Sequence, residues 1–147
     1  MLYYLLRIVH IAAMGTWFGV SLLAAGDLRR TLAAGPAHVD LLLARFAAIS
    51  RVASAAGWTT VLSGLALIFS LGGFGKVPHA IHAGLLLALV LVGLGIATGM
   101  QGQKAALALK AGADPGPARK RAGMFGGIAH LLWFVILCLM VLTKVVG

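Results

Sequence analysis

Three histidines and one arginine lie within stretches of sequence that are otherwise almost wholly apolar. His10 and Arg7 stand three residues apart in LLRIVHIAAMGTWFGV, and His82 and His130 lie in two later apolar stretches. Ionisable side chains are costly in apolar surroundings unless they are paired or hold a ligand. Imidazole nitrogen is an axial ligand of haem iron and also suits copper. The chemistry that these residue types indicate is therefore haem or metal binding.

The composition identifies the surroundings of these residues as a lipid bilayer. The 147 residues are 61% hydrophobic and 10% charged, with a mean hydropathy of +1.04. A soluble domain of this size cannot hide that much apolar surface. Four stretches have the length of about 20 residues that a helix needs to cross a bilayer. They are Leu5–Leu23, Ala53–Leu71, Ala80–Gly99 and Gly123–Leu142. The sequence predicts an all-α, up-down bundle of four transmembrane helices, with residues 1–147 as one integral membrane domain.

Segments beside these stretches predict where the helices continue and where they break. HVDLLLARFAAISR before the second stretch and QGQKAALALKAG after the third are amphipathic, so we expect the helices to extend through them. The Pro/Gly-rich segment AGADPGPA (111–118) predicts a break before the fourth helix. Three small-residue pairs predict close helix packing or room for a flat ligand, namely Gly15–Gly19, Gly95–Gly99 and Gly123–Gly127.

The basic residues are distributed unequally between the two ends of the expected bundle. The chain has 12 Lys and Arg against three Asp and Glu, for a net charge of +9. In a membrane protein this balance sets orientation and does not indicate nucleic acid as a partner. One end carries only Arg7, Lys76 and Lys144. The other end, predicted to be cytoplasmic, carries Arg29, Arg30, Arg45, Arg51, Lys104, Lys110, Arg119, Lys120 and Arg121. We therefore expect a multi-pass protein of the cell inner membrane with both termini on the periplasmic or exterior side.

Depth in the bilayer relates the histidines to one another. His10 lies ~7.5 Å and His82 ~6 Å inside the same edge of the apolar region, a geometry that suits a haem b held between two helices. Arg7 and His79 each precede one of these histidines by three residues, which places donors for haem propionates one turn nearer the surface. His130 lies ~10 Å from the opposite edge and is a reserve ligand, for a second haem or in place of one of the pair.

Plainer interpretations and a rival metal stay open. Arg7 can extend to the lipid headgroups, and His10 can bond a carbonyl on a neighbouring helix. Met14 follows His10 by four residues, so imidazole and thioether could together hold Cu(I). Catalysis by paired carboxylates is excluded within the four stretches, because they contain no Asp or Glu.

The first stretch, LLRIVHIAAMGTWFGVSLLAAGDLRRTL, resembles the opening helix of the HemJ-type protoporphyrinogen oxidases and the related CopD-like membrane proteins. The shared pattern falls here on His10, on Trp17 with the Phe-Gly that follows it, and on Arg29. SRVASAAGWTTVLSGLALI is similar to the second helix of the family, and AIHAGLLLALVLVGLG to the third, with His82 at the family's histidine. The resemblance implies a four-helix membrane protein that binds haem b with His10 as the first candidate ligand.

The chain also departs from the HemJ pattern at three places. Gly84 stands where the family has a lysine, Gly127-Ile128 replaces its Asn-Glu, and His130 stands where it has no histidine. The resemblance therefore implies haem binding more strongly than porphyrinogen oxidation.

The preferred function from sequence is haem b binding for electron transfer or a membrane redox reaction, with His10 and His82 as the axial pair. A redox protein or a quinone would be its partner, and the chain could form a homo-oligomer. One alternative is a CopD-like copper permease in which His10, Met14 and His82 bind the metal transiently. The other is a membrane anchor for a redox complex, without a cofactor of its own.

Overall fold

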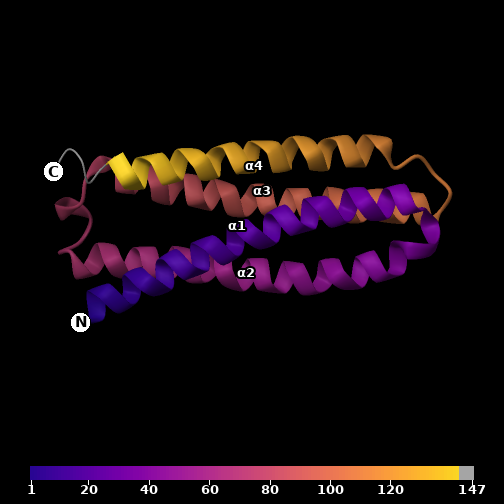
Figure 1. The fold of residues 1–147 in the computed structure, drawn as a ribbon. Helices are drawn as coiled ribbons and strands as arrows, with labels where there is room; N and C mark the ends of the chain where they lie inside the picture. The colour runs from indigo at the N-terminus through magenta and orange to yellow at the C-terminus, as the bar shows by residue number, and fades with distance from the viewer. Residues whose placement is uncertain (143–147) are drawn as a thin grey trace.

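Four long helices make up nearly all of the protein. The computed structural model describes residues 1–142, which form helices α1, α2, α3 and α4 and no strand (Figure 1). Each of these four helices is long and apolar enough to span a membrane. The bounds are Leu2–Ala34 for α1, Val39–Ser70 for α2, His79–Lys110 for α3 and Gly116–Leu142 for α4, with short 3-10 helices η1 at Pro36–His38 and η2 at Phe74–Lys76. The chain is therefore an integral membrane protein with an all-α four-helix bundle, as the sequence predicted.

The helices run alternately up and down, so the bundle has two chemically different ends (Figure 1). One end holds Met1, η2 and the last turn of α4, and we call it the terminal end. The other holds the α1–α2 turn and the α3–α4 connection with most of the Lys and Arg residues, and we call it the basic end. Lys144 lies outside the described residues. Most contacts between helices lie within the pairs α1–α2 and α3–α4, and α2 and α3 join the two pairs.

The extents of the helices agree with the sequence at α2 and α3 and exceed it at α1 and α4. The two amphipathic segments continue α2 and α3 as predicted. Helix α1 continues past Leu23 to Ala34, and α4 begins at Gly116, inside the segment that was predicted to break the chain. The predicted break before α4 is confirmed at residues 111–115, and α4 can begin at Gly116 because Pro117 lies in its first turn, where a missing N–H breaks no hydrogen bond.

Individual glycines set the close approaches between helices. A Cβ atom at Gly57 would lie 3.3 Å from the Trp17 ring, and one at Gly64 would lie 3.1 Å from Cε1 of His10. On the other pair, a Cβ atom at Gly84 would lie 2.7 Å from Cε of Met140. The three predicted glycine pairs make no such approach, since Cβ atoms at all six positions would meet nothing within 4 Å among the described residues. The prediction of close helix packing at those pairs was therefore wrong for the described residues. The six glycines instead have open space beside them.

Two apolar clusters hold the helices together. The middle of the bundle packs around Trp17 and Trp133, whose rings meet edge to face at a centroid distance of 5.2 Å. Near the basic end, Val39 and Leu42 are fully buried, and Phe46 lies against the position of Gly102. Large apolar side chains elsewhere are exposed, as expected for surfaces that face lipid.

Candidate functional site

His10 is fixed by hydrogen bonds between α1 and α2. Its Nδ1 atom lies 3.0 Å from the main-chain oxygen of Thr60 and 3.1 Å from Oγ of Ser63. A main-chain carbonyl only accepts, so the contact with Thr60 requires a proton on Nδ1. The ring is held closely because Gly64 has no side chain to displace it. This is the neighbouring-helix contact that the sequence allowed as the plainer interpretation of His10.

The same contact leaves the second ring nitrogen of His10 available. Nε2 makes no hydrogen bond to the described part of the chain. In a neutral imidazole with the proton on Nδ1, Nε2 carries the lone pair. Metal-binding histidines commonly have this arrangement, in which one nitrogen donates to a carbonyl and the other binds the metal. The geometry therefore suits ligation by His10 through Nε2.

His82 and His79 lie together at the start of α3. Their ring centroids are 5.9 Å apart, and the His82 ring stacks on Phe74 of η2 at 5.7 Å. The Nδ1 atom of His82 is buried and has no hydrogen-bond partner among the described residues. At 100° per residue, His82 lies about 200° around α3 from Gly84, which faces α4. The ring of His82 is thus on the face of α3 away from α4, against Phe74 of η2.

The register of the helices gives the relative depth of the histidines. Gly84 lies beside Met140, and Trp17 lies beside both Trp133 and Gly57. Counting from these contacts at 1.5 Å per residue places His82 within about 3 Å of the level of His10. The structure gives the two histidines nearly one depth but does not bring them into contact. Their pairing as axial ligands stays a prediction.

His130 belongs to a different part of the bundle. Its ring meets Phe18 of α1 edge to face at 5.8 Å, and Phe18 also meets Trp133 at 5.6 Å. Because Phe18 is eight residues along α1 from His10, His130 lies at least about 12 Å from the level of His10. The two imidazoles therefore do not face one iron. The Nε2 atom of His130 is buried without a hydrogen-bond partner among residues 1–142.

A groove between α1 and α4 brings His130 together with Met14. Its volume is about 200 Å³, and it is lined by Met14, Gly15, Phe18, His130, Trp133, Phe134 and Leu137. Met14 was predicted to bind a metal together with His10, but its side chain lines this groove together with His130. Trp17 is not part of this lining. Trp17 is only 6% exposed and packs between Trp133 and Gly57, so it is part of the apolar core.

The two residues predicted to contact haem propionates, Arg7 and His79, both lie near the terminal end. Arg7 is half-buried, and it has no ion pair or hydrogen bond to the described residues. His79 is exposed and contacts His82. Within residues 1–142, no group of three or more His, Cys, Asp or Glu side chains is placed to hold a metal ion.

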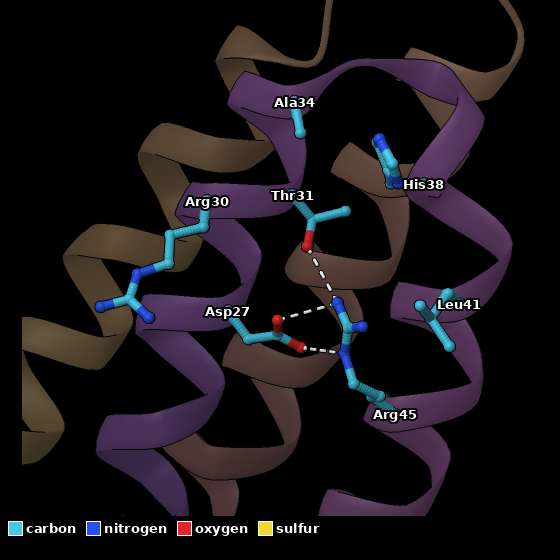
Figure 2. A pocket seen from close by; sticks show the side chains of 7 residues that line it. All are labelled: Asp27, Arg30, Thr31, Ala34, His38, Leu41 and Arg45. Atoms are coloured by element: carbon cyan, nitrogen blue, oxygen red, sulfur yellow. Dashed lines mark hydrogen bonds and ion pairs between the residues drawn. The ribbon is translucent and has the colours of Figure 1, made fainter.

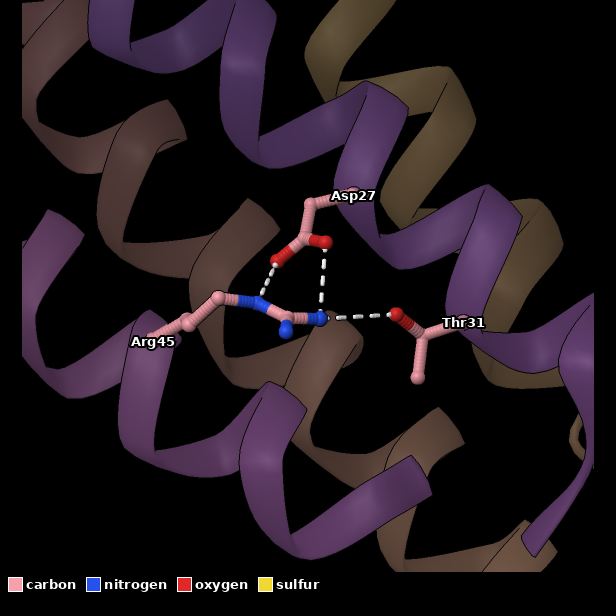
Figure 3. Close-up of polar contacts among 3 residues, drawn as sticks. All are labelled: Asp27, Thr31 and Arg45. Carbon is pink, nitrogen blue, oxygen red and sulfur yellow. Dashed lines mark hydrogen bonds and ion pairs between the residues drawn. The ribbon is translucent and has the colours of Figure 1, made fainter. Parts of the chain in front are cut away.

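Sequence reasoning missed a polar cluster at the basic end. Arg45 of α2 donates from Nε to one carboxylate oxygen of Asp27 at 2.8 Å and from Nη2 to the other at 2.9 Å (Figure 3). Nη2 also donates to the hydroxyl of Thr31 at 3.1 Å. Asp27 and Arg45 are each nine positions from Pro36, so an antiparallel turn there places them side by side. That symmetry is the signal that would have found the pair.

This cluster lines a pocket of about 240 Å³ at the α1–α2 turn (Figure 2). The other lining residues are Arg30, Ala34, His38 and Leu41. Comparison of the chain with protein-family models, with curated proteins and with solved structures finds no match.

Proposed function

We propose that this membrane protein binds haem b near its terminal end, with Nε2 of His10 as an axial ligand, and serves electron transfer or a membrane redox reaction. The observation that carries the proposal is the hydrogen bond from Nδ1 of His10 to the main-chain oxygen of Thr60. That bond selects the tautomer with a free Nε2 and holds the ring in one orientation. A main-chain acceptor in the middle of a packed helix gives this orientation little freedom to change.

Two further residues of the proposed site would help to hold the haem. Arg7 lies one turn nearer the terminal end and is unpaired among the described residues, so its guanidinium can bind a carboxylate there. Haem b, when bound, would supply a one-electron iron centre within the bilayer. His82, at nearly the same depth as His10, would be the second ligand. A quinone or a redox protein would be the partner in the exchange of electrons.

The proposal is tested by the colour of the protein. The chain is expressed with added haem precursor, purified in a mild detergent, and measured by its reduced-minus-oxidised spectrum. We expect a Soret band that His10→Ala removes. The matched control is His38→Ala, because His38 is exposed at the basic end. Elution volume and thermal unfolding show whether the variant is folded, and imidazole added to His10→Gly should restore part of the band. A colourless parent protein, or a full band in folded His10→Ala, would contradict the proposal.

Copper binding is a second candidate, favoured by the groove that Met14 and His130 share. Thioether and imidazole are ligands that suit Cu(I). A colourless protein that binds Cu(I), and loses it with Met14→Leu or His130→Ala, would support this function. A colourless protein without metal that co-purifies with a redox subunit would support the anchor interpretation.

We further propose that the basic end faces the cytoplasm of a cell whose inner membrane holds the protein. The support is the positive-inside rule, applied to the unequal distribution of Lys and Arg between the two ends.

A further inference from the structure

The pocket at the α1–α2 turn contains hydrogen-bond donors that the protein itself does not use. Thr31 is 5% exposed, and its hydroxyl oxygen accepts a hydrogen bond from Nη2 of Arg45. The hydroxyl proton of Thr31 is therefore left to donate, and no acceptor among the described residues takes it. A helical threonine usually gives this proton to the carbonyl four residues before it, as Thr16 does with Ala12. A buried donor without an acceptor calls for a bound group that accepts.

Positive charge in the pocket exceeds negative charge. Each carboxylate oxygen of Asp27 accepts one hydrogen bond from the guanidinium of Arg45, so this ion pair is neutral as a unit (Figure 3). Nη1 of Arg45 has no hydrogen-bond partner within residues 1–142, although the side chain is 39% exposed. Arg30, which also lines the pocket, has no ion pair there either. Figure 2 shows Arg30 and His38 to either side of Thr31, with the Arg30 guanidinium on the side of Asp27 away from Arg45. The Thr31 hydroxyl, Nη1 of Arg45 and the Arg30 guanidinium are thus unused donors, which suits an anion.

The pocket lies at the depth of lipid headgroups. Arg7 and Asp27 are consecutive charged residues on α1 and are twenty positions apart. Twenty residues of helix span about 30 Å, which is the thickness of the hydrocarbon layer. With Arg7 at one edge of that layer, Asp27 and its partner Arg45 lie at the other edge. The apolar side chains of Leu41 and Ala34 complete the lining, so the pocket offers both a polar and an apolar surface.

We propose that this pocket binds the phosphate group of an anionic membrane lipid. The phosphate oxygens accept hydrogen bonds from the hydroxyl of Thr31 and from Nη1 of Arg45, the charge of Arg30 attracts the phosphate from the edge of the pocket, and an acyl chain lies along Leu41. A lipid is favoured over a soluble anion by the depth of the pocket and by the basic residues around it, which attract anionic lipids to this end of the bundle.

The test compares binding of phosphatidylglycerol with binding of phosphatidylcholine. The delipidated full-length protein is titrated with each lipid in a non-ionic detergent, and bound lipid is counted by native mass spectrometry. We expect phosphatidylglycerol to bind more tightly. Arg30→Gln should weaken its binding about fivefold, the effect of losing one charged group that lines the pocket. Arg29→Gln is the matched control, because Arg29 is a neighbouring exposed arginine that does not line the pocket.

A second pair of variants distinguishes a specific binding site from nonspecific electrostatic attraction. Thr31→Val keeps the shape of the side chain and removes the donor, so it should also weaken phosphatidylglycerol binding about fivefold, whereas Thr31→Ser should retain it. Equal losses with Arg29→Gln and Arg30→Gln would overturn the proposal in favour of diffuse electrostatics. Equal binding of the two lipids would overturn it as well. Displacement of the lipid by inorganic phosphate at a similar concentration would show a site for soluble anions instead.

Discussion

The Nδ1 atom of His10 lies 3.0 Å from the main-chain oxygen of Thr60, and this contact ties a side chain of α1 to the backbone of α2. No side-chain change at Thr60 can remove a main-chain acceptor. The orientation of His10 is therefore tested most directly by crowding the ring from Gly64, whose absent Cβ would lie 3.1 Å from Cε1 of the imidazole.

We expect Gly64→Val to displace the His10 ring and to lower the free energy of unfolding by about 1–3 kcal/mol, the usual effect of overpacking. Haem content per mole of protein should fall with it. Gly93→Val is the control, because a Cβ at Gly93 would meet nothing within 4 Å. Thermal unfolding in detergent and the Soret absorbance report the two effects. Unchanged stability and haem content in Gly64→Val would show that His10 is not held as described.

His130→Ala should leave the spectrum of a haem on His10 unchanged, since the two histidines differ by at least about 12 Å in depth. His82→Ala tests whether α3 supplies the second ligand, and the sequence-based hypothesis expects loss of the band or a change to high spin. Absorption and electron paramagnetic resonance spectra of the purified variants distinguish these outcomes. Loss of haem from His130→Ala with retention in His82→Ala would make His130 the ligand and refute the depth argument.

Gly102→Ala should destabilise the basic end of the bundle. A Cβ there would lie 2.9 Å from Cε2 of Phe46, a rigid and buried ring, so we expect a loss of about 1–3 kcal/mol in the free energy of unfolding. Gly99→Ala lies one turn away with nothing within 4 Å, and it should be neutral or slightly stabilising. Unfolding by heat or by a denaturing detergent measures both variants. Equal stability of the two would mean that α2 and α3 do not meet at Phe46.

The Asp27–Arg45 ion pair should contribute modestly to stability. Its side chains are 25% and 39% exposed, so solvent screens the attraction, and we expect a coupling energy of about 0.2–1 kcal/mol. A double-mutant cycle with Asp27→Asn and Arg45→Gln gives that energy, and it should decrease as salt is added. Arg45→Lys should lose most of it, because an ammonium group cannot make the two parallel hydrogen bonds to Asp27. A coupling energy of zero at low salt would contradict the described geometry.

Both termini should lie on the periplasmic or exterior side, because the opposite end holds most of the basic residues. A phosphatase reporter that is active only outside the cytoplasm should work when fused to the C-terminus. The same reporter inserted near Ala113, in the α3–α4 connection, should be inactive. The reverse pattern would invert the orientation.

The number, type and order of the helices followed from the sequence because apolar runs of about 20 residues admit few alternatives in a bilayer. The depth of a histidine followed from counting residues. The direction of a side chain did not, because it depends on the rotation of each helix about its axis. Thus His82 has nearly the depth of His10 but lies on the face of α3 away from α4, and Met14 lines a groove with His130.

The glycines likewise show that a sequence pattern marks possible sites of close helix packing, whereas the neighbouring helix determines which of them are used. Glycine pairs with four-residue spacing are widespread in the chain, yet the close approaches occur at Gly57, Gly64, Gly84 and Gly102. Which glycine is used depends on the bulky group that faces it, such as Trp17 or Phe46. The sequence of one helix does not contain that information about its neighbour.

Because α1 and α2 pack mainly against each other, the contact between His10 and Thr60 needs only the first half of the chain. During synthesis this first hairpin leaves the ribosome and enters the bilayer before α3 and α4 exist. A domain made at 5–20 residues per second would complete its second half several seconds later. The imidazole of His10 is thus oriented early, before α3 and α4 cover the first hairpin.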